Sequence, residues 1–385
     1  MPEYPGQITS KLPNVGTSIF AVMTKLAVEH DAINLSQGFP DFPISEKLIA
    51  RAHHYMKKGF NQYAPMPGVP ALRKAIANKV KRSYNVEYDA ETEITITAGA
   101  TQALFAAITA FVREGDEVII FEPAYDSYAP AVKLQGGLVK YARLARPEFA
   151  INWDSVTKMV SNRTRMIIIN SPHNPTGSLL SANDMKQLEL LTSHRDIVVL
   201  SDEVYEHLIF DGNSHQSACL YPGLASRSLV VGSFGKTFHA TGWKTGFVLA
   251  PANLMAEFRK VHQFNVFAVN TPIQHAVADM LKDEENYQGL PDFFQARRDL
   301  FASLTAQSRF GLLPSRGTYF QLLDYSRISD MPEKDFATWL VREHGLAVIP
   351  LSAFYHDQHN QQLVRVCFAK TEETLHKAAA ILCRI

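Results

Sequence analysis

The sequence predicts an α/β fold with a largely parallel sheet and a second, smaller α+β domain. Between residues 94 and 250, short and almost uninterrupted apolar runs alternate with amphipathic helical stretches. Strands of this kind are buried on both faces, as in parallel sheets covered by helices. Beyond about residue 280 the strands are fewer and their apolar residues alternate more. We therefore expect a large domain at 46–280 and a small domain formed by 1–45 together with 281–385.

The N-terminal part predicts helices around one short strand. Thr17 is suited to cap a helix whose apolar face includes Ile19, Phe20, Met23 and Leu26. A strand at 33–35 and helices at 45–58 and 69–83 follow. The loop SQGFPDFP separates that strand from the first of these helices.

The central region carries the alternation on which the fold class depends. The runs expected as strands are 94–97, 117–121, 138–141, 166–170, 197–201, 228–231 and 246–250. Helical patterns are expected at 101–112, 128–134 and 182–192. The C-terminal part predicts helices at 254–263, 274–281, 293–304, 334–344 and 372–382, and strands at 319–323, 347–350 and 363–368.

Composition excludes several functional classes. Lys+Arg and Asp+Glu both number 38 among 385 residues, so no basic field is present to bind nucleic acid or an anionic membrane. The three cysteines, Cys219, Cys367 and Cys383, lack metal-ligand spacing and suit a reducing compartment. No apolar run reaches membrane-spanning length, and the first residues do not resemble a signal peptide. We expect a cytoplasmic protein without a metal site.

Polar residues follow the carboxyl ends of four predicted strands. AGAT follows the strand at 94–97, with amides of Ala100 and Thr101 opening a helix, and SPHNPTG with Asn174 follows 166–170. DEVY, with Asp202 and Tyr205, follows 197–201, and a lysine-bearing loop follows 228–231. Ligands of open parallel sheets bind beyond these strand ends, so we expect these groups to meet at one site.

The loop SFGKTFHATGWKTG contains a candidate nucleophile. Lys236 follows Gly235 just beyond a buried strand, where burial can lower the pKa of an amine and so make it nucleophilic toward carbonyls. Ser233 and Lys244 are placed to share one anionic group with it. A lysine in such a loop is usually a solvated surface residue, so the other strand ends decide the interpretation.

Each of these motifs also has an ordinary structural explanation. GAT commonly starts a helix, NP commonly forms a turn, and an aspartate after a strand commonly caps a helix. Together they supply an anion cradle, a carboxylate, neutral hydrogen-bond donors and a nucleophilic amine. This combination indicates a site for pyridoxal 5'-phosphate.

The motifs AGAT, NPTG, SDEVY and SFGKTFHATGWKTG resemble those of class I/II aminotransferases, pyridoxal-phosphate enzymes of fold type I. Within that family the likeness is greatest to the group of methionine aminotransferases and kynurenine aminotransferase/glutamine transaminase K. It covers nearly the whole chain. The resemblance implies a large domain with a mostly parallel seven-stranded sheet and a smaller α+β domain.

The resemblance also assigns roles around the cofactor. Lys236 matches the family's Schiff-base lysine, which also moves the proton from the substrate's α-carbon. Asp202 would face the pyridine nitrogen, and Asn174 and Tyr205 would hydrogen-bond the phenolic oxygen. Tyr125, in FEPAYDSYAP, would stack on the ring.

The cofactor's phosphate would be held by four residues. These are the amides of Ala100 and Thr101 together with Ser233 and Lys244. Many relatives have arginine at the position of Lys244. The point charge of lysine cannot bind an anion in bidentate fashion as a guanidinium does.

Arg365 matches the family's substrate-carboxylate arginine. It alternates with apolar residues in LVRVCF, where an arginine requires an anion as partner, either a substrate carboxylate or a structural carboxylate of the protein. Gly38 would offer its backbone, and Asn174 its side chain, to the same substrate. Tyr63 matches a residue that reaches the neighbouring subunit's phosphate, so we expect a homodimer with shared sites.

The expected substrate pocket is apolar and aromatic. It would include Ile19, Phe39, Tyr125 and the partner subunit's Phe267, with Asn265 beside it, and we find no second arginine for an acidic side chain. This favours methionine as amino donor, followed by phenylalanine, histidine, kynurenine and glutamine, with a 2-oxo acid as acceptor.

Three alternatives differ from transamination in reaction or in class. The closest is a cysteine-conjugate carbon–sulfur β-lyase, which uses the same cofactor. An amino-acid-sensing regulator would need a DNA-binding extension, and no helix-turn-helix or basic arm precedes Thr17. A dinucleotide dehydrogenase would need GxGxxG after a strand, which the sequence lacks.

Overall fold

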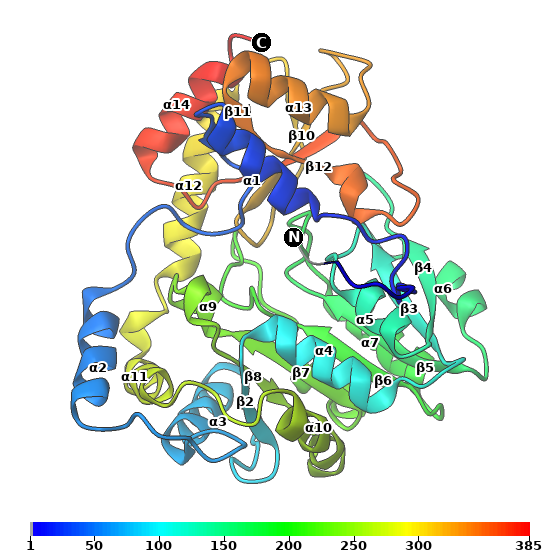
Figure 1. Cartoon of the computed structure of the whole chain (residues 1–385), viewed down its shortest axis with the longest axis vertical. Coiled ribbons are helices and arrows are strands. Elements are labelled where there is room, and N and C mark those ends of the chain that lie inside the picture. The colour runs from blue at the N-terminus through cyan, green and yellow to red at the C-terminus, as the bar shows by residue number, and fades with distance from the viewer. Residues whose placement is uncertain (1–2) are drawn as a thin grey trace.

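The computed structural model describes residues 3–385 and has at its centre a seven-stranded sheet (Figure 1). The strand order is β2-β8-β7-β6-β5-β3-β4. The strands are β2 (Ile94–Thr97), β3 (Glu117–Glu122), β4 (Leu138–Arg143), β5 (Thr164–Asn170), β6 (Val198–Asp202), β7 (Ser228–Ser233) and β8 (Gly246–Leu249). Only β8 runs against its neighbours β2 and β7, so the predicted α/β class with a mostly parallel sheet is confirmed.

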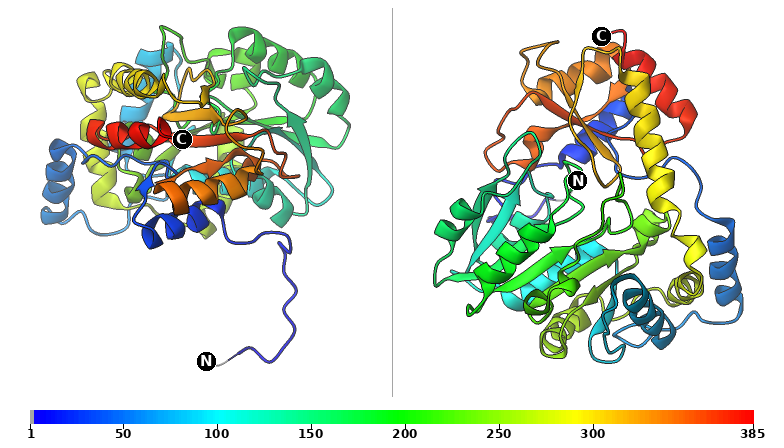
Figure 2. Two further views of the ribbon diagram at one scale, coloured as in Figure 1. Left: turned by 90° about the horizontal axis from the view of Figure 1, so that it is seen from above. Right: turned by 180° about the vertical axis from the view of Figure 1, so that it is seen from behind.

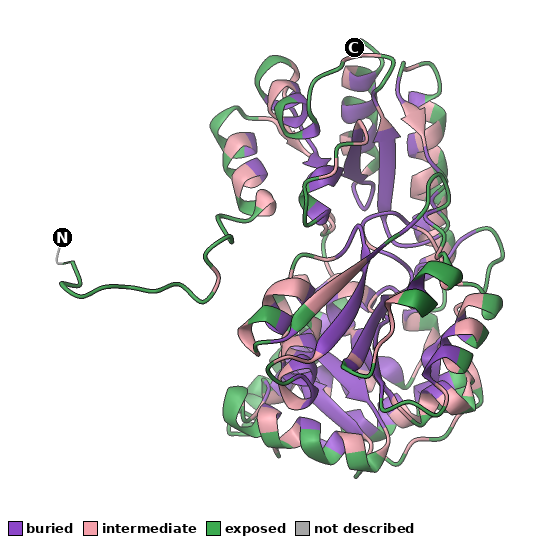
Figure 3. Ribbon diagram, turned by 90° about the vertical axis from the view of Figure 1, so that its right-hand side faces the viewer, coloured by how far each residue is buried: buried purple, intermediate pink, exposed green. Residues whose placement is uncertain are grey.

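Helices cover both faces of this sheet because alternate strand residues point to opposite sides. In β3, Val118 and Ile120 belong to one apolar cluster and Ile119 to the other. The first cluster includes residues of α4 (Ala100–Phe111), α5 (Tyr128–Leu134) and α10 (Ala252–Asn265). The second includes residues of α3 (Pro70–Tyr84), α7 (Ala182–Thr192) and α11 (Thr271–Leu281). Except for the edge strand β4, the strands are accordingly buried along most of their length (Figure 3).

A smaller antiparallel sheet lies above the large one in the view of Figure 1. Its order is β12-β13-β10-β9, and a separate parallel pair joins β1 to β11. The strands are β1 (Ile33–Asn34), β9 (Gly311–Leu312), β10 (Phe320–Asp324), β11 (Leu346–Ala347), β12 (Ile349–Pro350) and β13 (Leu363–Cys367). The helices beside them are α1 (Ile19–Glu29), α12 (Leu290–Thr305), α13 (Glu333–His344) and α14 (Glu372–Leu382).

The pairing of β1 with β11 returns the N-terminal segment to the C-terminal part of the chain, with Ile33 opposite Leu346. The next helix, α2 (Glu46–Lys57), instead packs on α11, beside the large sheet. These contacts support the proposed division into 46–280 and 1–45 plus 281–385, of which residues 1 and 2 lie outside the described part. The boundary near residue 280 falls in the last turn of α11, before α12, the long helix that runs alongside both parts (Figure 2).

The structure differs from the predicted elements in several local features. Ser18, not Thr17, caps α1, and its hydroxyl accepts from the amide of Ala21. The expected strand at 347–350 is divided between two sheets as β11 and β12. Four short elements were not predicted: α6 (Trp153–Met159), α8 (Pro222–Ala225), α9 (Phe234–Thr237) and β9, all of seven residues or fewer. Such short elements carry too little periodicity to be recognised.

The segment before α1 extends away from the rest of the chain (Figure 2). Nearly all of its residues from Glu3 to Thr17 are exposed. Among residues 3–385, no helix is both long enough and apolar enough to cross a membrane.

Candidate active site

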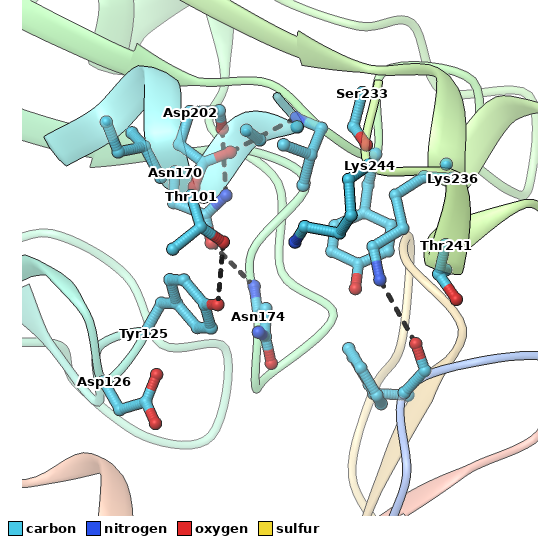
Figure 4. Close-up of a pocket in the computed structure, with 18 of the residues that line it drawn as sticks. Thr101, Tyr125, Asp126, Asn170, Asn174, Asp202, Ser233, Lys236, Thr241 and Lys244 are labelled. Atoms are coloured by element: carbon cyan, nitrogen blue, oxygen red, sulfur yellow. Dashed lines mark hydrogen bonds between the residues drawn. The ribbon is translucent and has the colours of Figure 1, made fainter. Parts of the chain in front are cut away.

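A cavity of about 280 Å³ lies at the carboxyl ends of the parallel strands, between the two sheets (Figure 4). It is lined by most of the residues that the sequence singled out. These are Gly38, Ala100, Thr101, Tyr125, Asn174, Asp202, Tyr205, Ser233, Lys236, Lys244 and Arg365. Most of them lie at or just after strand ends of the large sheet, which brings them to one edge although they are far apart in sequence. Gly38 and Arg365 come from the part of the chain around the small sheet.

Three predicted residues lie outside this cavity wall. Tyr63 is 83% exposed and its ring meets that of Phe267, with centroids 5.4 Å apart. Phe39 is half exposed, and the Lys370 ammonium lies over its ring. Ile19 starts α1, and the helical phase directs the next residue, Phe20, to the cavity instead.

Lys236 lies in the single turn α9, directly after β7. The amide of Phe234 donates to the carbonyl of Thr245. The amide of Phe238 donates to the carbonyl of Phe234, and this bond closes the turn. The Lys236 amine donates to the Gly38 carbonyl at 3.1 Å and to the Tyr319 hydroxyl at 2.6 Å. Burial lowers the pKa of Lys236 to about 8, so a useful fraction of the amine is neutral and nucleophilic near neutral pH.

Asp202 ends β6 and is buried. Its carboxylate accepts from the Tyr128 hydroxyl at 2.6 Å and from the amide of Val204 at 3.3 Å. Burial raises the pKa of Asp202 to about 6, although both hydrogen bonds and the Lys236 charge act in the opposite direction. A buried carboxylate of this kind gains most from a cationic partner placed in the cavity.

From the end of β6 onward, some side chains line the cavity and others point into the protein interior. Asp202 and Tyr205 line the cavity, whereas Glu203 accepts from the Ser201 hydroxyl and the amide of Ala218 and pairs with His215. On the same interior side, Glu206 forms an ion pair with Lys79 of α3 and accepts from Tyr84.

The charge of Lys79 dominates the environment of the Glu206 carboxylate. Burial would raise the pKa of Glu206, but Lys79 overcomes that effect and the pKa falls to about 2. The ion pair ties the backbone that carries Tyr205 to α3, so the interior half of the segment fixes the half that faces the cavity.

An anion cradle lies at the N-terminus of α4. Gly99 precedes this helix with φ +79°, and a Cβ on it would stand 3.5 Å from the Lys244 amine. A Cβ on Gly246 would lie 3.1 Å from the amide nitrogen of Ala100, so glycine leaves that amide accessible. Free amides at a helix N-terminus, with the Ser233 hydroxyl and a lysine beside them, are suited to a phosphate.

Arg365 is buried on β13 and has no carboxylate partner within salt-bridge distance among the described residues. It donates to the Asn174 side-chain oxygen at 2.8 Å and to the Ser36 carbonyl at 3.0 Å. Its Nε atom is buried and has no hydrogen-bond partner. Burial lowers the pKa of Arg365 to about 10, which still leaves it cationic at neutral pH. This arrangement favours an external anion over the structural ion pair that the sequence left open.

Some residues of the site were not recognised in the sequence. Tyr128 and Tyr319 contact Asp202 and Lys236, and Phe20 lines the cavity beside the Arg365 guanidinium. Asn170, at the end of β5, accepts from the amide of Asn174 at 2.9 Å and so holds the NPTG turn. Tyr128 lies in the same FEPAYDSYAP motif as Tyr125 and Asn170 precedes NPTG, so both carried a local signal. Tyr319 had none.

The charges of the cavity wall favour ligands with two anionic groups. The cations are Lys236, Lys244 and Arg365, and the carboxylates are Asp126 and Asp202. The cradle lies beside Lys244, whereas Arg365 belongs to the small sheet. Across residues 3–385, no group of three or more His, Cys, Asp or Glu side chains is placed to hold a metal ion.

Comparisons with known proteins identify the family of the chain. Residues 30–382 match the family Aminotransferase class I and II. The chain is 52% identical to methionine aminotransferase of Escherichia coli K12, over 96% of each chain. It is 34% identical to human kynurenine–oxoglutarate transaminase 1, over 95% of each chain.

The structural comparison gives the same result. The crystal structure of YbdL from Escherichia coli, described as having a methionine aminotransferase function, superposes with a TM-score of 0.97 at 50% identity and covers 99% of this chain and 100% of its own. The sequence resemblance and the fold-type I prediction are thereby confirmed. With its strand-end site and these full-length relatives, the chain belongs to the class I and II aminotransferase family.

Proposed function

We propose that this aminotransferase uses pyridoxal 5'-phosphate to move the amino group of an apolar or aromatic L-amino acid, with methionine as first choice, to a 2-oxo acid. The observation that carries the proposal is the single cavity that joins the Lys236 amine, the Asp202 carboxylate, the cradle at α4 and the Arg365 guanidinium. The names of the relatives support methionine and kynurenine as substrates.

The residues present fit the proposed cofactor. The Arg365 Nε, which has no hydrogen-bond partner, and the open amide of Ala100 are donors on different elements of the cavity wall, as expected for one carboxylate and one phosphate. The cofactor would be held by Ala100, Thr101, Tyr125, Asn174, Asp202, Tyr205, Ser233, Lys236 and Lys244. When bound, pyridoxal phosphate supplies an aldehyde for amines and a cationic ring that accepts electrons from the amino acid's α-carbon.

The chain's own groups then perform distinct tasks. Lys236 Nζ would hold the cofactor through its aldehyde and, when the nitrogen is free, would take up and carry the proton removed from the α-carbon. Asp202 would offer its buried carboxylate to a cationic ring nitrogen and so stabilise that charge. Arg365 and Asn174 orient the substrate carboxylate, and Gly38 offers its backbone to the same group.

The side-chain specificity follows from the remaining wall. Phe20 and Tyr125 supply aromatic surface, and Arg365 is the only arginine that lines the cavity in the described chain. An acidic side chain would be desolvated there without a guanidinium of its own. Asp126, which also lines the cavity, adds repulsion against a second carboxylate.

A panel of amino donors tests this specificity. We expect methionine to give the highest kcat/KM, followed by phenylalanine, histidine, kynurenine and glutamine, and aspartate to be at least about a hundredfold poorer. Formation of the 2-oxo acid product is measured with one common acceptor. Aspartate as the best donor would contradict the proposal. Stoichiometric pyruvate and ammonia from a cysteine conjugate, without acceptor, would support β-lyase chemistry instead.

We further propose a homodimer in which Tyr63 completes the partner's phosphate site. Tyr63, Phe264 and Phe267 are exposed aromatic residues, and Tyr63 and Phe267 stack edge to face. Exposed aromatic groups of this kind favour an interface between two copies of the chain. The partner subunit's Phe267 would then lie near the substrate. A cytoplasmic location stays a prediction from cysteine content.

A mixture of two inactive variants tests the shared site. We expect Tyr63→Ala to lose at least about tenfold in kcat/KM, and Lys236→Ala at least about a thousandfold. After subunit exchange, the mixed dimer regains one complete site, so the mixture recovers up to about a quarter of wild-type activity. A mixture no more active than its components, or a Tyr63→Ala variant with full activity, would contradict the shared site.

A further inference from the structure

The buried Tyr319 hydroxyl connects three segments that lie far apart in sequence. Tyr319 directly precedes β10 and is 1% exposed. Its hydroxyl donates to the carbonyl of Gly38, in the loop after β1, and accepts from the Lys236 amine at 2.6 Å. The same amine donates to the Gly38 carbonyl at 3.1 Å.

The direction of these hydrogen bonds determines what the hydroxyl can do. Because its single proton points to the Gly38 carbonyl, its oxygen presents lone pairs to the Lys236 amine. A cationic amine donates more strongly than a neutral one, so this arrangement favours the ammonium form. The rings of Tyr205 and Tyr319, whose centroids lie 5.3 Å and 5.2 Å from the amine, act in the same sense.

We propose that Tyr319 is a positioning residue that holds the Lys236 amine whenever its nitrogen is not covalently engaged, and stabilises the ammonium once the amine has taken up a proton. This inference rests on the proposed function of Lys236. In that role the lysine must retain the proton taken from the α-carbon until it is delivered, and it must stay within reach of the reacting atoms. The Tyr319 hydroxyl and the Gly38 carbonyl are the two acceptors that fix its position.

The other groups around Lys236 also affect the pKa of its amine. Burial lowers the pKa of the amine, and the nearby cations lower it further, whereas the Asp202 carboxylate and the Cys367 thiol raise it. The groups that face the amine from the surrounding elements are Gly38, Asp202, Tyr205, Lys244, Tyr319, Arg365 and Cys367.

Tyr319→Phe removes the hydroxyl and keeps the ring, so the test isolates the hydrogen bond. The readout is the pH dependence with which acetic anhydride acylates Lys236 in the cofactor-free full-length protein, followed by peptide mass spectrometry. We expect the midpoint of the wild-type protein near pH 8. In the variant it should fall by about one pH unit, which makes labelling at pH 6.5 up to about tenfold faster.

Tyr325→Phe is the matched control. Tyr325 is also fully buried, follows the same strand, and donates to the carbonyl of Met331 at 2.7 Å, outside the cavity. Removal of the Tyr325 hydroxyl should destabilise the protein about as much as removal of the Tyr319 hydroxyl. It should leave the acylation midpoint of Lys236 unchanged. The inference is overturned if the Tyr319→Phe midpoint lies within about 0.3 pH unit of the Tyr325→Phe midpoint, or above it.

The experiment separates this inference from the proposed function. Acylation of Lys236 requires no cofactor, so the difference in midpoint between wild type and Tyr319→Phe reports on the Tyr319 hydroxyl whether or not the proposed function holds. If the loaded wild-type protein gives no borohydride-stable adduct on Lys236, the proposed function fails whatever the labelling shows. If the adduct forms and the midpoint does not move, only the role of Tyr319 fails.

Discussion

Replacement of Lys236 with alanine is expected to lower the rate of amino-group transfer by at least about a thousandfold. The amine is the only lysine nitrogen hydrogen-bonded to both Gly38 and Tyr319 in the described chain, and no other lysine in the cavity lies on the turn after β7. The variant should still bind the cofactor through the cradle at α4, but without a covalent link. Turnover with methionine and borohydride reduction followed by peptide mass spectrometry measure the two effects.

A surface lysine provides the control for this substitution. Lys260, on α10, is exposed and pairs with Glu257, so Lys260→Ala should keep normal turnover and a reducible link at Lys236. Normal transamination by Lys236→Ala would remove the assignment of the base. A borohydride adduct on a different lysine would remove the assignment of the covalent link.

Asp202→Asn is expected to have opposite effects on catalysis and on stability. Asparagine keeps the shape and can still accept from the Tyr128 hydroxyl, but it cannot compensate a cationic ring nitrogen. Turnover should therefore fall by about 10²–10³-fold, with weaker cofactor binding. Single-turnover spectra with methionine and cofactor titration measure these losses. The exposed Asp299→Asn serves as the control.

The stability effect depends on pH because burial raises the pKa of Asp202 from 3.8 to about 6. A carboxyl group whose pKa is raised in the folded state contributes its full stability below pH 3.8, and that contribution is lost as the pH rises through about 6. Asparagine does not ionise. The free energy of unfolding of the variant relative to wild type should therefore grow by about 2 kcal/mol between pH 4.5 and pH 8.

Urea denaturation of the cofactor-free full-length protein at these two pH values measures the change. An equal stability difference between variant and wild type at both pH values would show that burial does not raise the pKa of Asp202. A larger stability of wild type at pH 8 would show that its carboxylate is already compensated by the neighbouring Lys236 charge. Either result would weaken the argument that Asp202 awaits a cationic partner.

The strand ends were predictable because parallel strands place their carboxyl ends at one sheet edge. That rule alone brought Ala100, Asn174, Asp202 and Lys236 to a common cavity. It requires only the order of elements along the chain, not their packing. The local motifs around these residues then limited the chemistry that the cavity could perform.

Contacts that depend on packing between distant segments were not predictable. Tyr319 meets Lys236 across 83 positions of sequence, and its direction follows from how the small sheet lies on the large one. The choice of Phe20 over Ile19 depends on the rotation of α1 about its axis, which periodicity fixes only within a broad apolar face. Aromatic residues in apolar surroundings look alike in sequence whether they fill a core or line a cavity.

The antiparallel course of β8 has a consequence for how this enzyme could be altered. Ser233 and Gly246 are cross-strand partners at the ends of β7 and β8, so the chain between them leaves and rejoins the sheet at one point. Lys236 and Lys244 therefore both lie in one segment, residues 234–245, that begins and ends at the same point of the sheet. Exchange of residues 234–245 for the equivalent piece of a homologue with arginine in place of Lys244 would transplant the covalent and the anion-binding groups as one module, without a change in strand register.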